Sequence, residues 1–169
     1  MYAWQTGAAW FFSLRPTGGT LAAWGFRRPT FAFIWVIPLA LIVVYAVVYA
    51  HDILINPEPQ ELLSQFPHTA AGAALLALLA VVLAPFFEEL FFRGFLFRGL
   101  ARAWGWPLGA VVSGAVFGAV HQQLTVFIPL FALGVALAWV YQRTGSIWTA
   151  ITLHAVFNGL SVIAWVLAG

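Results

Sequence analysis

The chain alternates between long apolar stretches and shorter polar ones. Phe31–Ala50 carries no charge over twenty residues, which is enough for a helix to cross the apolar core of a bilayer. Further apolar runs cover roughly residues 70–100, 107–121, 124–142 and 147–168. The run at 107–121 is short, as a tilted or re-entrant helix would be. The pattern predicts an all-α fold, a polytopic transmembrane bundle of about five spanning helices.

Polar positions divide the chain into two parts. Residues 1–30 interleave aromatic side chains with arginines, as expected for a cytoplasmic N-terminal segment that rests on the membrane interface. Residues 31–169 form the predicted transmembrane domain, whose motif-bearing core covers 70–169. Within this domain, residues 51–69 contain acidic residues and three prolines, which indicates a loop outside the membrane.

Composition supports a membrane protein and excludes several other classes. Apolar residues make up 63% of the chain and charged residues 7%, whereas charged residues are about 25% of soluble domains. The net charge of +2 is too small to indicate a nucleic-acid partner. The absence of cysteine excludes disulfides, thiolate metal sites and a cysteine nucleophile.

The basic residues predict an orientation in the membrane. With alternating passes, the arginines that flank the predicted helices all fall on one side, which the positive-inside rule makes cytoplasmic. They are Arg15, Arg27, Arg28, Arg98, Arg102 and Arg143. A belt of aromatic residues is expected on the same rim: Trp104, Trp106, Trp139, Tyr141 and Trp148. We therefore expect an integral protein of a bacterial or archaeal cell membrane, with a cytoplasmic N-terminus and the 51–69 loop outside.

Six polar side chains interrupt the apolar helices. They are Glu88, Glu89 and Arg93 in the second run, His121 at the end of the third, and His154 and Asn158 in the fifth. A charged side chain at the centre of a spanning helix costs about 2.5–3.5 kcal/mol, so it needs a partner or a function. At the rise of an α-helix, Glu88 and the uncharged side chains of the set (His121, His154 and Asn158) lie roughly 10–21 Å from the cytoplasmic helix ends. One shared site within the bilayer is the simplest interpretation.

Helical spacing sorts these side chains. Glu89 and Arg93 are four residues apart and can pair on one face, whereas Glu88 points about 100° away and lacks that partner. His154 and Asn158 are also four apart and share a face. Structural interpretations stay open: a Glu89–Arg93 ion pair, packed histidines and interhelical hydrogen bonds are all common in bundles.

The ordered motifs resemble those of the type II CAAX prenyl endopeptidase family, which also includes bacteriocin-processing and self-immunity membrane proteins. The motifs are Glu-Glu-x-x-x-Arg at Glu88-Glu89-Arg93, Phe-x-x-x-His at Phe117-His121, and His-x-x-x-Asn at His154-Asn158. The resemblance covers about residues 70–169. Five spans are fewer than family members often have, which fits a minimal member or part of a longer chain.

The resemblance implies an intramembrane endopeptidase that uses a glutamate-activated water and neither metal nor cofactor. Glu88 and His121 would activate the water, His154 and Asn158 would stabilise the oxyanion, and Glu89 and Arg93 would support the site. The partners would be a peptide or protein substrate, with or without a lipid group, and the bilayer. This chemistry is reasonable on general grounds, because a carboxylate removed from water can act as a base near neutral pH.

Two other functions are compatible with the same residues. Glu88, His121 and His154 form a possible two-histidine, one-carboxylate zinc set, as in a metalloendopeptidase. Against zinc, the sequence has no His-Glu-x-x-His and places no second carboxylate near either histidine to orient it. Buried Glu and His also occur in non-enzymatic proteins, such as a proton-relay transporter or an immunity scaffold. No internal repeat of the kind found in transporters is present.

Overall fold

The computed structural model describes residues 20–56 and 66–168. Within these ranges the chain forms helices joined by turns, and no strand is present there. Most of the predicted N-terminal segment (residues 1–19) and the centre of the predicted outer loop (57–65) lie outside the described residues. The all-α bundle predicted from the sequence is confirmed.

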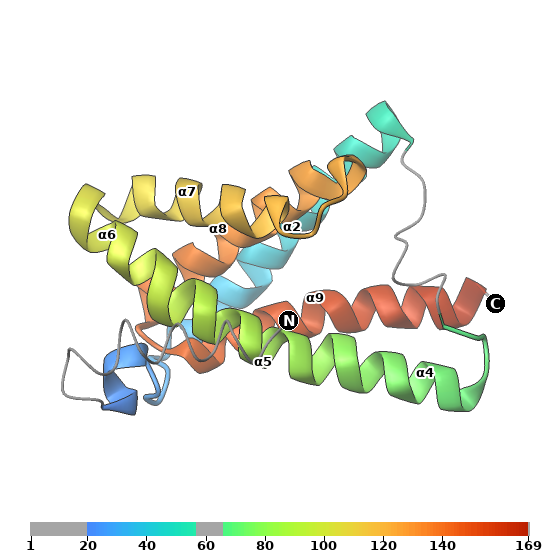
Figure 1. Cartoon of the computed structure of the whole chain (residues 1–169), viewed down its shortest axis with the longest axis horizontal. Helices are drawn as coiled ribbons and strands as arrows, with labels where there is room; N and C mark the ends of the chain where they lie inside the picture. Colours follow the sequence, from blue (N-terminus) through green and yellow to red (C-terminus); the bar gives the residue numbers. More distant parts are fainter. Residues whose placement is uncertain (1–19, 57–65, 169) are drawn as a thin grey trace.

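Figure 1 shows the order of the helices. A short 3-10 turn, η2 (Leu21–Trp24), precedes α2 (Phe33–Ile55). One continuous helical run then comprises α4 (Ala70–Ala77), η3 (Leu78–Leu83), α5 (Ala84–Glu89), η4 (Leu90–Phe97) and α6 (Arg98–Trp104). The last elements are α7 (Trp106–Ala119), η5 (Leu124–Val126), α8 (Phe127–Thr144) and α9 (Ile147–Ala168).

Four helical segments are long and apolar enough to cross a membrane, and α7 is shorter. Its 14 residues extend only about 21 Å. Two predicted boundaries were wrong. Helix α2 continues through Ile55 and ends where Asn56 adopts a left-handed conformation with φ of 46°, so residues 51–55 belong to the helix and not to a loop. Helix α7 ends at Ala119, which leaves His121 in the turn beyond it.

Pro85 does not break its helix but changes the hydrogen bonding around it. The Ala84 N–H donates to Leu79 O, five residues back. The next bond in this register would run from residue 85 to Ala80 O, and proline has no N–H to make it. The Asn158 side chain of α9 donates to Ala80 O instead, at 2.7 Å. Pro85 therefore leaves a carbonyl that ties α9 to the glutamate-bearing helix.

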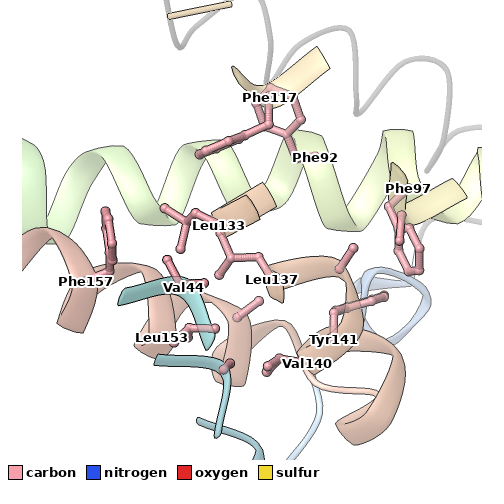
Figure 2. Packing of buried hydrophobic residues seen from close by; sticks show 14 of the residues in the cluster. Val44, Phe92, Phe97, Phe117, Leu133, Leu137, Val140, Tyr141, Leu153 and Phe157 are labelled. Carbon is pink, nitrogen blue, oxygen red and sulfur yellow. The ribbon is translucent and has the colours of Figure 1, made fainter. Parts of the chain in front are cut away.

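The core forms between α2, α7, α8, α9 and the glutamate-bearing run, and Figure 2 shows part of it around Phe92, Phe117 and Leu133. Glycines let α7 and α8 approach closely, as small residues do in membrane bundles. A Cβ on Gly134 would lie 2.8 Å from Gly114 Cα. In Figure 1, α4 and α9 run side by side. At the end of the bundle where the C-terminus lies, they diverge from α2, α7 and α8.

The segment before α2 is fixed to the turn between α8 and α9. Ser146 Oγ donates to Arg27 O at 2.7 Å, and the Ile147 N–H donates to Gly25 O at 2.9 Å. Tyr141 donates to Trp24 O at 3.3 Å and is buried. The sequence predicted Tyr141 in the aromatic belt. The structure instead makes it a core residue.

Candidate active site

Glu89 holds the centre of a buried polar chain. Its Oε1 atom accepts from Arg93 Nη1 at 2.8 Å and lies 2.9 Å from His154 Nδ1. The side chains of Glu89 and Arg93 are 0% exposed and that of His154 is 3% exposed. The predicted Glu89–Arg93 pair is confirmed. Its extension to His154, 65 residues further along the chain, was not predicted.

Arg93 connects the glutamates to α8. Its Nη2 donates to Gly134 O at 2.9 Å, and its guanidinium carbon lies 5.1 Å from the centre of the Phe117 ring. This position over an aromatic face is favourable for a cation. Three helices therefore meet at one arginine: the run that carries it, α7 through Phe117, and α8 through a carbonyl.

The contact with Glu89 determines which nitrogen of His154 carries a proton. An ionised carboxylate only accepts hydrogen bonds, so with Glu89 ionised beside Arg93 the 2.9 Å contact assigns a proton to Nδ1. The other nitrogen, Nε2, lies 4.0 Å from Glu88 Oε2. The Glu88 side chain is 13% exposed, more than any of the three groups in the buried chain. Glu88 is therefore the more exposed of the two carboxylates.

His121 lies on the outer side of this group. It is exposed and follows the end of α7, whereas the sequence predicted it within the third helix near mid-membrane. Its Nδ1 lies 2.8 Å from Phe117 O, which leaves Nε2 as the nitrogen able to act on another group. The Phe117 ring stands 5.0 Å from the His121 ring and 5.6 Å from the His154 ring. The Phe117 ring therefore packs against both histidines.

Asn158 shares the face of α9 with His154 as predicted, but its amide is already engaged. One N–H of the side chain donates to Ala80 O, so only the second remains for another acceptor. The sequence could not show this bond, because it depends on how α9 packs against η3. The same is true of the carbonyl of Gly134 that holds Arg93.

The geometry also bears on a metal site. Among the described residues, no group of three or more His, Asp or Glu side chains is arranged to hold a metal ion. The sequence nevertheless predicted that no second carboxylate would orient either histidine, and this prediction was wrong. A carboxylate does orient a histidine, since Glu89 lies within hydrogen-bonding distance of His154 Nδ1.

Comparison with known families matches residues 70–160 to the family described as "Type II CAAX prenyl endopeptidase Rce1-like". The chain belongs to this Rce1-like family. All three motifs, from Glu88 to Asn158, fall within the matched region.

A curated relative supports the same assignment. The "Putative membrane peptidase YdiL" of Bacillus subtilis (strain 168) is 30% identical over 89 residues, which are 53% of this chain and 36% of the relative. The matched part thus spans about a third of the length of that protein. No solved structure matches the chain. Together with the four helices able to span a bilayer, membership of the Rce1-like family identifies an integral membrane protein of a peptidase family.

Proposed function

We propose that this protein is an intramembrane endopeptidase that hydrolyses a peptide bond with a water activated by Glu88 and His121. The observation that carries the proposal is the chain from Glu88 through His154 and Glu89 to Arg93. Such a set is costly among apolar helices. Glu89, Arg93 and His154 form the buried part of this chain, and Glu88 is its partly exposed end.

Glu88 is the proposed base. Water would give a proton to its carboxylate while the oxygen adds to the scissile carbonyl carbon, and that proton would then pass to the leaving nitrogen as the C–N bond breaks. The partial exposure of Glu88 gives water a route to it. His121 Nε2 would hold the same water, because Nδ1 of that ring is engaged by Phe117 O.

His154 and Asn158 are proposed to stabilise the negative charge that develops on the carbonyl oxygen. His154 can donate from Nε2 only when both ring nitrogens carry protons, since Nδ1–H is directed at Glu89. With one proton, Nε2 is an acceptor and would help Glu88 to bind the water instead. Asn158 would contribute the N–H that is not bonded to Ala80 O. Glu89 and Arg93 would position His154 without touching the substrate.

Two other functions remain as alternatives. A zinc-dependent membrane protease would use Glu88, His121 and His154, and the described residues supply no grouped ligand set for it. A non-enzymatic role, as an immunity scaffold or proton-relay transporter, would use the same buried groups without hydrolysis. The family comparison favours a peptidase.

The deciding experiment is a cleavage assay on the purified full chain in detergent and in liposomes. Internally quenched peptides that end in a CAAX sequence, with and without a farnesyl group, would serve as probes. Glu88→Gln keeps the shape of the side chain and removes the base, so cleavage should fall by about 10²–10⁴-fold. Thermal stability should fall less than in Glu89→Gln, because the hydrogen bond to Arg93 comes from Glu89.

Each outcome separates the alternatives. Cleavage by the wild type and its loss in Glu88→Gln would support the proposal, and mass spectrometry of the products would locate the cut. Cleavage that a strong chelator abolishes and zinc restores would favour the metal-dependent alternative. Equal cleavage by Glu88→Gln and the wild type would exclude Glu88 as the base.

A further inference from the structure

A cleft of about 500 Å³ lies away from the candidate active site, where the segment after η2, helix α6 and the end of α8 meet. Its most polar lining residues are Arg27, Arg98 and Arg102. None of the candidate active-site residues lines it. Its volume is in the range of ordinary ligand pockets.

The cleft brings three arginines together. Arg98 and Arg102 are one helical turn apart on α6, and Arg27 joins them from the segment before α2. Like charges four residues apart on a helix repel each other. None of the lining residues is acidic. The acidic residues of the chain lie elsewhere in the sequence: Asp52, Glu58, Glu61, Glu88 and Glu89. An anion in the cleft would relieve this repulsion.

The cleft is also built to hold one arginine in place. The backbone of Arg27 is fixed because its carbonyl accepts from Ser146 Oγ at 2.7 Å, and Gly25 O accepts from the Ile147 N–H at 2.9 Å. The Arg27 guanidinium itself donates to Ala22 O at 3.3 Å and keeps further N–H groups for a phosphate, to which a guanidinium can donate two hydrogen bonds at once.

The remaining lining residues suit a lipid better than a free anion. Phe97 and Tyr141 lie edge to face with ring centres 6.0 Å apart, and both line the cleft. Figure 2 shows them together at one edge of the core. Trp106, also in the lining, is 40% exposed, as tryptophans at the membrane interface are. Basic pockets between membrane helices commonly bind anionic headgroups.

We infer that this cleft binds the phosphate of an anionic phospholipid from the leaflet at the arginine-rich end of the bundle. The arginines would contact the phosphate, and the exposed Trp106 would contact the glycerol and the first carbons of the acyl chains. The cytoplasmic leaflet is the one rich in anionic lipids, which agrees with the orientation expected from the arginines. The inference does not depend on peptidase activity.

The test uses the full chain in a neutral detergent and short-chain phosphatidylglycerol as the probe. Binding would be measured by native mass spectrometry and by the rise in melting temperature across a titration. Each arginine near an anionic headgroup contributes a factor of about five in affinity. An Arg98→Gln, Arg102→Gln double variant should therefore bind roughly thirtyfold more weakly than the wild type.

The chain offers a matched control at the same end. Arg143 stacks on Trp139 at 5.8 Å and is not among the cleft-lining residues, so Arg143→Gln should bind like the wild type. If the double variant fails to fold, Arg102→Gln alone changes an exposed residue and should weaken binding about fivefold.

Further probes decide the source of the phosphate. Phosphatidylcholine of the same chain length and inorganic phosphate should both stabilise the wild type much less than phosphatidylglycerol. Equal stabilisation by phosphatidylcholine, or by inorganic phosphate alone, would overturn the lipid assignment. So would equal affinity of the wild type and the double variant, or displacement of the lipid by a short peptide with a free C-terminal carboxylate.

Discussion

The two adjacent glutamates approach the same imidazole from different sides. Glu89 lies 2.9 Å from Nδ1 of His154, and Glu88 lies 4.0 Å from Nε2. Glu89 also shares its oxygen with Arg93, so it is engaged in the folded state. Glu88 is the more exposed of the two. Identical side chains thus have different environments, which is why different consequences are expected when each is replaced.

Glu89→Gln and Arg93→Leu should each reduce stability by about 3–5 kcal/mol, because each leaves a buried charge without its partner. The double variant should recover part of this loss, and the coupling energy would measure the pair. Activity should not recover with it, because His154 Nδ1 would still lack its carboxylate. Unfolding in mixed micelles and the cleavage assay would be followed on the same samples. Recovery of both quantities together would show that Glu89 has no part in holding His154.

At the scale of the helix, Pro85 and Asn158 act on one carbonyl. Asn158→Ala should reduce stability by about 1 kcal/mol, since it removes one hydrogen bond to Ala80 O. In a Pro85→Ala background residue 85 has an N–H that can reach the same carbonyl, so the loss should be smaller. Unfolding of the four proteins of this cycle in mixed micelles gives the coupling. Additive effects would mean that the missing N–H of Pro85 is not what makes the carbonyl available.

The close contact between α7 and α8 should make stability sensitive to a single added methyl group. Gly134→Ala would place Cβ 2.8 Å from Gly114 Cα, and overpacking of this kind costs about 1–3 kcal/mol. It should also displace the carbonyl that accepts from Arg93. Gly99→Ala is the matched control, because a Cβ there meets no atom within 4 Å. Melting temperatures would be compared, and equal values for the two variants would contradict close packing at Gly134.

Sequence patterns predicted the helices better than their ends and better than their contacts. The length of the apolar runs located the helices, and spacing of four identified the Glu89–Arg93 pair. The end of α7 was missed because hydropathy does not drop until after Val120, although the helix ends at Ala119. The contact of His154 with Glu89 joins residues that are 65 positions apart in the sequence, and that of Asn158 with Ala80 joins residues 78 positions apart. Such contacts follow from helix packing, which the periodicity of a single helix does not contain.

For the molecule as a whole, the described charges are separated along the bundle. Three arginines share the cleft beside α6 and the end of α8, and Arg143 occupies the last turn of α8. Asp52 lies near the C-terminal end of α2. This asymmetry predicts that the arginine-rich end is cytoplasmic, and that the loop after α2 and the C-terminal end of α9 face outward.

The absence of cysteine from the chain makes this orientation directly measurable. Single cysteines would be introduced as Gln142→Cys near the end of α8, Gln60→Cys between α2 and α4, and Leu167→Cys near the end of α9. Gln142 and Leu167 are exposed positions, so labelling there reports access and not unfolding. A maleimide that cannot cross membranes should label Gln60→Cys and Leu167→Cys in intact cells, and Gln142→Cys only in inverted vesicles.

The reverse pattern would refute the orientation and place the arginine cleft in the outer leaflet. Labelling of Gln142→Cys and Leu167→Cys from the same side would show that α9 does not cross the bilayer, despite being long and apolar enough to do so.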